Sequence, residues 1–333
     1  MMNLFYRWIK SSEFVLAIVL LLVISFFGLL NPTFFSIQNL YDTLKNSIVV
    51  GIFACTVMMV MISGGVDMSF MAIAMSAAYI TIKALVALNL NAPMPLIFFI
   101  SAAVGLVLGL LNAYFISRFD IPVFIVTLST ASIYRGLLLG FVGNDYIAST
   151  EMPRATIDFS KNYILNLADK DGTTFGLHIS VFLMLGIMIF TYVFMKYTTL
   201  GRGIFALGGD AVSAERIGFN LNRVRTVLYA YAGVVAGIAG MVYVSNNRTA
   251  NPFDLHGDEL AVIAAVVLGG TSIQGGKGTV VGVLLGVLLT VIINNSLVLI
   301  GVPSYWQKAT FGSLIIVATV VQVMKDRAKT KPC

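Results

Sequence analysis

Long apolar runs separated by short polar segments constrain this 333-residue chain more than any other feature. A helix that crosses a bilayer needs about 20 predominantly apolar residues. The sequence therefore predicts ten spans, near residues 14–30, 46–63, 70–90, 96–116, 121–143, 177–195, 226–246, 259–274, 279–299 and 305–324. Runs this long exclude a large soluble helical protein, and their continuity excludes a transmembrane barrel, whose strands are short and alternate in polarity. We predict an all-α polytopic membrane protein with one transmembrane domain over residues 1–333.

The distribution of basic residues predicts the orientation of these spans. With the N-terminus in the cytoplasm, the inner segments are 1–13, 64–69, 117–120, 196–225, 275–278 and 325–333, and they hold most of the Lys and Arg residues. The long outer loop 144–176 has more acidic than basic residues. Because cytoplasmic loops carry an excess of Lys and Arg, both termini are predicted to be cytoplasmic. The formal net charge of +6 therefore reports orientation, and we expect no nucleic-acid partner.

One span is unusually short. The apolar run Glu259–Leu268 has only ten residues before a glycine-rich turn begins. If it failed to cross, the last two spans would invert and the basic tail would lie outside. We therefore expect it to cross, with its last turns irregular and enclosed by the bundle.

Residues 196–225, KYTTLGRGIFALGGDAVSAERIGFNLNRVR, form a polar island between two spans. The segment holds five basic residues and two acidic residues, so it belongs in water on the cytoplasmic side. Its glycine-rich start, short helical run and closing glycine are too patterned for a simple spacer. We expect this segment to contact a soluble partner.

Two glycine-rich turns interrupt the spans. In Ser63–Ser69, SGGVDMS, Gly64 and Gly65 allow a break, after which Asp67 and Ser69 either cap the next helix or line a water-filled path. The second turn, GGTSIQGGKG at 269–278, fails as a phosphate-binding P-loop, because Lys277 is followed by Gly278 where Ser or Thr is required. It is either a flexible inner turn or a broken helix that exposes polar groups inside the bundle. We expect no ATP site on this chain.

Isolated polar residues also lie within the predicted spans, namely Lys83, Asn112, Arg135, Asn294 and Asn295. Lys83 is near enough to the outer face to extend its amine into water. Arg135 needs an acidic partner or a wet cavity, unless the span boundary is misplaced. No cluster of acid, base and nucleophile is visible, and the two cysteines and two histidines have no metal-ligand spacing. We predict no catalytic, cofactor or metal site.

Four stretches resemble a known family: SGGVDMS (63–69), IPVFIVTLSTASIYRGL (121–137), GRGIFALGGDAVSAERIGFN (201–220) and VVLGGTSIQGGKGTVVG (266–282). They are similar to the ribose-type sugar permeases of bacterial ABC importers, within the branched-chain amino acid/ribose permease superfamily. The resemblance extends from Asn31-Pro32 to about Lys325. The first stretch departs from the family, because Phe70, Met71 and Ala72 follow it where a glycine is usual.

The resemblance implies an inner-membrane subunit that pairs with a second permease copy, as a homodimer or a heterodimer. It also implies a cytoplasmic ATP-binding cassette ATPase, which carries the ATP, and a periplasmic solute-binding protein that delivers a monosaccharide. Ala211–Gly218 would be the coupling helix that contacts the ATPase. The candidate coupling residues are Arg202, Asp210, Ala211, Ala214, Glu215, Arg216, Gly218, Arg223 and Arg225. The candidate pathway residues are Gly64, Gly65, Asp67, Ser69, Asn112, Arg135, Gly269, Gly270, Thr271 and Ser272.

Three alternatives remain open at the level of sequence. The first is an importer of the same superfamily for a nucleoside or a branched-chain amino acid. The second is a secondary transporter coupled to protons or sodium through Asp67. The third, a membrane enzyme, lacks any visible catalytic cluster.

Overall fold

The computed structural model describes residues 12–168 and 174–330, and it is built almost entirely from helices. The helices are α2 (Ser12–Leu30), the 3₁₀ turn η1 (Pro32–Phe35), α3 (Ile37–Ile62), α4 (Phe70–Ala87), α5 (Met94–Phe119), α6 (Val123–Leu137), the π-helical turn η2 (Leu138–Val142), α7 (Arg154–Ser160), α8 (Ser180–Tyr197), α9 (Thr199–Gly209), α10 (Ala211–Arg216), α11 (Leu221–Asn247), α12 (Glu259–Leu268), α13 (Val280–Leu299) and α14 (Ser304–Thr330). Strands β1 (Tyr163–Ala168) and β2 (Thr174–His178) pair antiparallel.

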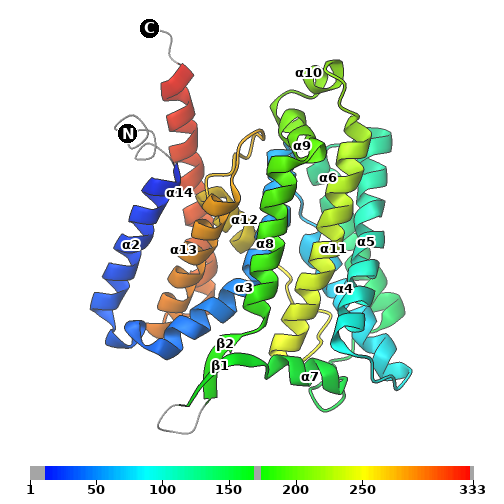
Figure 1. Cartoon of the computed structure of the whole chain (residues 1–333), viewed down its shortest axis with the longest axis vertical. Helices are drawn as coiled ribbons and strands as arrows, with labels where there is room; N and C mark the ends of the chain where they lie inside the picture. Colours follow the sequence, from blue (N-terminus) through cyan, green and yellow to red (C-terminus); the bar gives the residue numbers. More distant parts are fainter. Residues whose placement is uncertain (1–11, 169–173, 331–333) are drawn as a thin grey trace.

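The long helices lie side by side and run between two opposite ends of the molecule (Figure 1). The start of α2, the end of α14 and helix α10 share one end, which we call the α10 end. Helix α7 and the β1–β2 hairpin lie at the other, the α7 end. Within the described residues, eight helices are long and apolar enough to cross a membrane. The predicted all-α polytopic fold is confirmed, with the hairpin as a small addition outside the spans.

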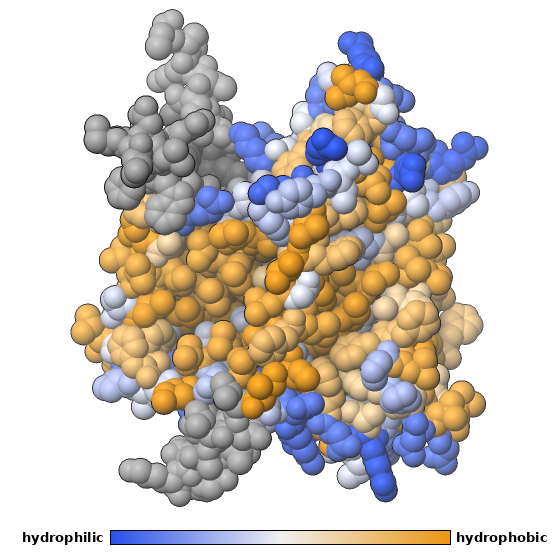
Figure 2. Space-filling model, in the orientation of Figure 1, coloured by the Kyte–Doolittle hydropathy of each residue, from blue (hydrophilic) through white to orange (hydrophobic). Residues whose placement is uncertain are grey.

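The surface of the bundle is apolar over its middle and polar at both ends (Figure 2). Large side chains such as Leu21, Phe99 and Ile189 are more than half exposed along the helices. A continuous exposed apolar surface of this extent is untenable in water but is what lipid tails contact. The helices therefore form a membrane-embedded bundle.

Helices α3, α4 and α11 occupy the centre of the bundle and are its most buried spans. Helix α11 packs closely on α5, because glycines face each other at the crossing. A Cβ atom on Gly105 would lie 2.2 Å from the carbonyl oxygen of Gly233, and one on Gly237 would lie 2.3 Å from that of Ser101. The hydroxyl of Ser101 donates to the carbonyl of Gly237 at 2.8 Å. Small residues thus bring two backbones into contact, as is common between membrane helices.

The crossing is made by residues 248–276, so the predicted short span 259–274 covers only part of it. At one end of the crossing, Arg248 donates to Ser160 of α7, and at the other end the N–H of Gly276 donates to the carbonyl of Ile62. The prediction that only its last turns are irregular was incomplete. Residues 248–258 also lack regular helix, and Leu255 and Gly257 take positive φ values of 62° and 84°. Helix α12 therefore forms only part of the crossing.

Several predicted boundaries were wrong, and the largest shift is in α3, which begins at Ile37 where the sequence predicted residue 46. Of residues 64–69, which were predicted as an inner segment, Gly64 is exposed but Asp67 and Ser69 are buried and bonded within the bundle. The span predicted to begin at residue 177 begins at Ser180, since residues 174–178 form β2. The outer loop consequently carries α7 and a hairpin, which the sequence pattern did not indicate.

Candidate functional site

A cavity of about 880 Å³ opens between α3, α11, α13 and α14. Its lining includes the first turns of α3 and α14 and the last turns of α11 and α13, so it lies in the half of the bundle nearest the α7 end. Its volume falls within the range of roughly 300–1,000 Å³ that is typical of small-molecule sites. On its deeper side Phe53 packs edge to face on Phe70, with ring centroids 5.1 Å apart.

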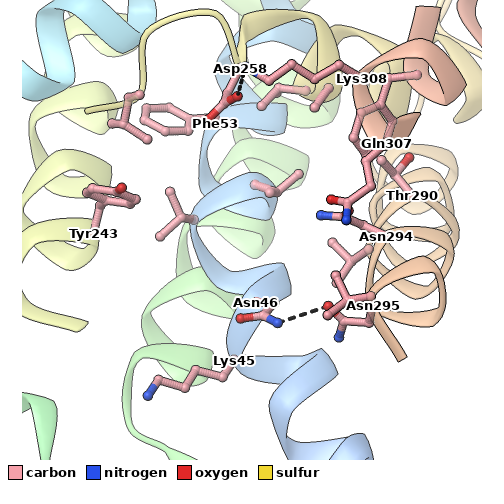
Figure 3. A pocket seen from close by; sticks show the side chains of 18 of the residues that line it. Lys45, Asn46, Phe53, Tyr243, Asp258, Thr290, Asn294, Asn295, Gln307 and Lys308 are labelled. Atoms are coloured by element: carbon pink, nitrogen blue, oxygen red, sulfur yellow. Dashed lines mark hydrogen bonds and ion pairs between the residues drawn. The ribbon is translucent and has the colours of Figure 1, made fainter. Parts of the chain in front are cut away.

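Amide side chains form much of the cavity wall (Figure 3). Asn46 of α3 donates to Asn295 of α13 at 3.0 Å, and Asn295 donates in turn to Thr43 at 3.0 Å. Gln307 of α14 donates to the carbonyl of Val302 at 3.1 Å. Hydrogen bonding therefore fixes several of these polar groups to the wall of the cavity.

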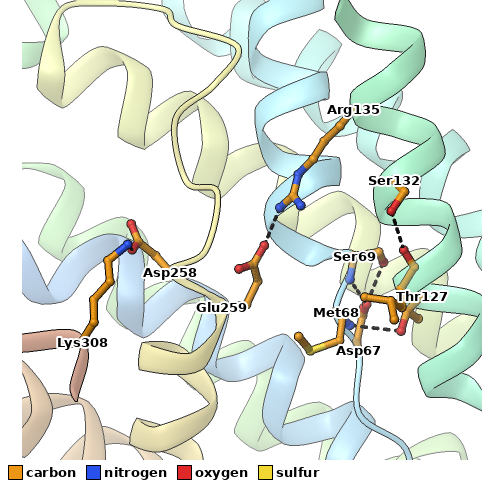
Figure 4. Close-up of polar contacts among 10 residues, drawn as sticks. Asp67, Met68, Ser69, Thr127, Ser132, Arg135, Asp258, Glu259 and Lys308 are labelled. Carbon is orange, nitrogen blue, oxygen red and sulfur yellow. Dashed lines mark hydrogen bonds and ion pairs between the residues drawn. The ribbon is translucent and has the colours of Figure 1, made fainter. Parts of the chain in front are cut away.

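The carboxylate of Asp67 is sealed within a buried network at the break between α3 and α4 (Figure 4). Its Oδ1 accepts the backbone N–H of Ser69 at 2.6 Å and the Ser69 hydroxyl at 2.7 Å. Asn112 of α5 donates to the same hydroxyl oxygen at 2.7 Å and accepts from Tyr134 of α6 at 3.0 Å. Asp67 thus bonds the residue just before α4, and the predicted cap by Ser69 is wrong, because its side chain caps no backbone group of the helix.

Two adjacent acidic residues hold the start of α12 from opposite sides (Figure 4). Glu259 pairs with Arg135 of α6, and Asp258 pairs with Lys308 of α14 at 3.6 Å. Arg135 thus has the acidic partner that its position in a span requires. The start of α12 lies beside the cavity and is tied to helices that lie on either side of it.

Three glycine-containing turns meet near the α10 end, and we call this contact the glycine junction. They are Gly64 after α3, Gly208 in the last turn of α9, and Gly275-Gly276 between α12 and α13. A Cβ atom on Gly208 would lie 1.7 Å from the carbonyl oxygen of Ile62 and 2.8 Å from the nitrogen of Gly276. One on Gly275 would lie 2.9 Å from the Cα of Gly64. Helix α9 therefore touches the backbone of both interrupted segments.

Helix α10 forms the tip of the α10 end. The short helix predicted at Ala211–Gly218 is therefore present. Asp210 accepts the N–H of Ser213 at 2.6 Å, and this bond lowers the pKa of the Asp210 carboxyl, so the cap is ionised at neutral pH. Gly218 ends the turn with a φ of +95°. On this tip Val212 and Ile217 are exposed, which leaves an apolar contact surface that nothing in the described chain covers.

The predicted coupling residues fall into two groups. Arg202, Glu215, Arg216 and Arg223 are exposed, whereas Ala214 is buried. The side chain of Arg225 already forms an ion pair inside this protein, with Asp120 at 2.6 Å. Their role in contacting a partner stays a prediction, and Arg225 has a structural partner already.

None of the ten predicted pathway residues lines the cavity. Ser69, Asn112 and Thr271 are fully buried, and Gly64 belongs to the glycine junction. Their role in a pathway stays a prediction. The sequence did contain a signal for the cavity wall, because Thr290 and Asn294 are four residues apart and so share one face of α13. Asp42 and Asn46 on α3 share this spacing, whereas Asn246 and Gln307 had no polar lining residue four positions away.

Comparisons with known proteins agree with this architecture. Residues 39–319 match the family described as branched-chain amino acid transport system / permease component. The chain is 31% identical over 326 residues to the ribose import permease protein RbsC of Escherichia coli (strain K12), covering 96% of this chain and 95% of that protein. It is 33% identical over 274 residues to the fructose import permease protein FruG of Bifidobacterium longum (strain NCC 2705), covering 81% and 78%.

A third relative is the autoinducer 2 import system permease protein LsrD of Photorhabdus laumondii. The two chains are 33% identical over 321 residues, which cover 95% of this chain and 91% of LsrD. No solved structure matches.

The apolar outer surface, the interrupted helices and the open cavity with amide side chains define a multi-pass membrane protein. The chain belongs to the branched-chain amino acid transport system permease component family. It is a permease component of an ABC importer, which makes it a transport subunit and not an enzyme.

Proposed function

We propose that the chain forms the transmembrane path for a monosaccharide in an ATP-driven importer of the bacterial inner membrane. The observation that carries this proposal is the amide-rich cavity within an otherwise apolar bundle. Amides donate and accept hydrogen bonds without carrying charge, so they suit an uncharged solute with many hydroxyl groups. The names of the similar permeases for ribose and fructose support the same class of solute.

We infer that ATP is hydrolysed by a separate cytoplasmic ATPase that contacts the α10 end. The exposed Val212 and Ile217, bordered by charged Glu215 and Arg216, offer an apolar centre with a polar rim. A periplasmic solute-binding protein would dock at the α7 end, beside the mouth of the cavity. A second permease copy, identical or paralogous, would complete the membrane part.

An ion-coupled secondary transporter is the rival in a different class. Its coupling residue would be Asp67, which here is 2% exposed and already accepts two hydrogen bonds. Asp67 also does not line the cavity, so the solute path that we propose does not reach it. The geometry therefore favours coupling through a partner ATPase.

Uptake into liposomes tests the proposal. The chain is reconstituted with its ATPase and binding protein, and uptake of radiolabelled ribose, fructose and leucine is measured with and without ATP inside the vesicles. We expect sugar uptake only when both ATP and the ATPase are present. Uptake driven by a proton or sodium gradient without the ATPase would contradict the proposal.

A further inference from the structure

The cavity wall changes from polar to apolar along α3. Asn39 and Asn46 lie near the start of the helix, seven residues apart and therefore on one face, and Val49 and Phe53 continue the lining deeper in the bundle. A solute that moves inward along this face loses water as it leaves the mouth. Hydroxyl groups that lose water need hydrogen-bonding partners, so the wall has to supply them near its polar end.

Three amides on this wall share one bonding pattern. The NH₂ group of Asn39 donates to a backbone carbonyl at 2.8 Å, that of Gln307 donates to another at 3.1 Å, and that of Asn46 donates to Asn295 at 3.0 Å. In each case the nitrogen is bound inside the protein, whereas the carbonyl oxygen accepts no hydrogen bond from the described residues. The three amides are therefore held in place and keep unused acceptors.

A solute in the cavity can reach these acceptors. Asn46 is an exposed residue of the wall (Figure 3). Asn39 and Gln307 are partly buried, but the amide oxygens that the described chain encloses without a partner belong to Asn246 and Asn294 instead. The wall thus contains two kinds of amide, and only the first kind offers its carbonyl group to the cavity.

The positions of the three acceptors favour a solute with several donors. Seven helical residues place Asn46 about 10 Å beyond Asn39, and Gln307 lines the cavity from α14. A sugar carries hydroxyl groups around its ring, so it can bond to one acceptor while it leaves another. Charge does not decide between a sugar and a zwitterion, because the wall also holds Asp42 and Lys45. The hydroxyl groups of the solute are what these acceptors distinguish.

We propose that Asn39, Asn46 and Gln307 are specificity-determining residues that accept hydrogen bonds from the hydroxyl groups of the transported solute. This inference rests on the proposed function, because it requires the cavity to be the path of the solute. It assigns the recognition of a polyol to three carbonyl groups, which α3 and α14 present to the cavity. The bonds made by their NH₂ groups orient these carbonyl groups.

The test replaces the three amides one at a time by apolar residues of similar size, in Asn39→Leu, Asn46→Leu and Gln307→Met. Thr290→Val is the matched control, since Thr290 lines the same cavity but its hydroxyl already donates to the carbonyl of Gly286 at 2.9 Å. ATP-driven uptake of ribose, fructose and their singly deoxygenated analogues is measured at low concentration in the reconstituted importer. We expect each amide variant to lose about 3- to 10-fold in uptake of the transported sugar, and Thr290→Val to stay within about 2-fold.

The deoxy analogues separate recognition from a structural role. An acceptor that bonds to one hydroxyl makes the wild type prefer the sugar over the analogue that lacks this hydroxyl, and the preference should shrink in the matching variant. A variant that only distorts the wall lowers the uptake of sugar and analogue alike. Co-purification with the ATPase identifies the variants that assemble, and Asn46→Ala replaces Asn46→Leu if the latter does not.

Two outcomes would contradict the inference in different ways. If the wild type takes up sugar and its preferences are unchanged in all three variants, the inference is overturned and the proposed function stands. If the wild-type importer shows no ATP-driven uptake of sugar, both are overturned.

Discussion

Arg135 on α6 and Glu259 on α12 join two helices far apart in the sequence through one partly buried ion pair. Their side chains are 26% and 9% exposed. Removing one partner of a buried pair leaves the other charge without compensation, which costs about 3–5 kcal/mol when both are fully enclosed. Because Arg135 is partly solvated, we expect Arg135→Ala to lower the free energy of unfolding by about 2 kcal/mol, measured by thermal unfolding in detergent.

The double variant Arg135→Gln with Glu259→Gln separates pairing from side-chain size. It removes both charges and keeps two groups that can bond to each other. Its stability should lie closer to the wild type than that of either single variant. Single variants as stable as the wild type would show that the pair does not hold α12.

His178 connects the hairpin to α7 through a neutral imidazole. Its Nδ1 accepts the N–H of Ser180 at 3.2 Å, and its Nε2 donates to the carbonyl of Phe159 at 3.1 Å. Burial, with the nearby charge of Lys45, lowers the pKa of His178. The unfolded chain therefore takes up the proton first as pH falls from the ordinary value of about 6.5, so folding loses stability between that value and the lowered pKa.

We expect the wild-type unfolding temperature to fall between pH 8 and pH 5 by more than that of His178→Gln. The glutamine variant cannot titrate in this range, so it isolates the histidine from other groups. Equal shifts in the two proteins would exclude His178 as the source of the pH dependence.

At the scale of elements, the sequence predicted the spans because a run of about 20 apolar residues is typical of a transmembrane helix. It also located α10, because the family resemblance placed a coupling helix at Ala211–Gly218, where the polar island has a short helical run and a closing glycine. It missed the hairpin 163–178, which lies among mixed residues in a loop, and the irregular residues 248–258. The cavity wall could not be predicted, because it depends on which faces of α3, α11, α13 and α14 meet in space.

Helix α10 presents its charged residues to solvent at the end of the bundle. Replacing Glu215 and Arg216 with Ala should weaken assembly with the ATPase by at least 10-fold, because charged rims steer and fix such contacts. Co-purification and titration with the ATPase measure this. Asp158→Ala with Lys161→Ala at the α7 end is the matched control. An unchanged affinity in the α10 variant would remove these residues from the contact.

A substitution at Gly208 can test whether α9 transmits a movement of α10 to the two glycine-rich turns that it touches, after α3 and after α12. Gly208→Ala would place a methyl group against the backbone of Ile62 and Gly276, so the glycine junction must separate. We expect at least a 10-fold loss of ATP-driven uptake while the ATPase still binds. Gly209→Ala is the matched control, since a Cβ atom there meets nothing within 4 Å, and it should keep uptake within about 2-fold. Normal uptake by Gly208→Ala would show that this close contact is dispensable.

At the scale of the whole molecule, the arrangement connects three regions that the sequence separates. The exposed tip α10 lies at one end, the glycine junction lies below it, and the cavity opens toward the other end. Packed elements shift between discrete arrangements and do not deform continuously, so a displacement of α9 must move the segments that it touches. This gives a partner at the α10 end a physical route to the two breaks and to the start of α12.

The orientation of the bundle decides whether this route begins in the cytoplasm. Single cysteines are placed at exposed positions on each end, Ser213→Cys on α10 and Asp158→Cys on α7, in a chain whose Cys333 is replaced by Ser. The remaining Cys55 is 1% exposed, so it should not react. With a membrane-impermeant maleimide on intact spheroplasts, we expect labelling of Asp158→Cys alone, and labelling of Ser213→Cys only after permeabilisation, because the basic residues of 196–225 favour the cytoplasmic side. The reverse pattern would place α10 outside the cell, where no ATP is available, and would exclude α10 as the contact for an ATPase.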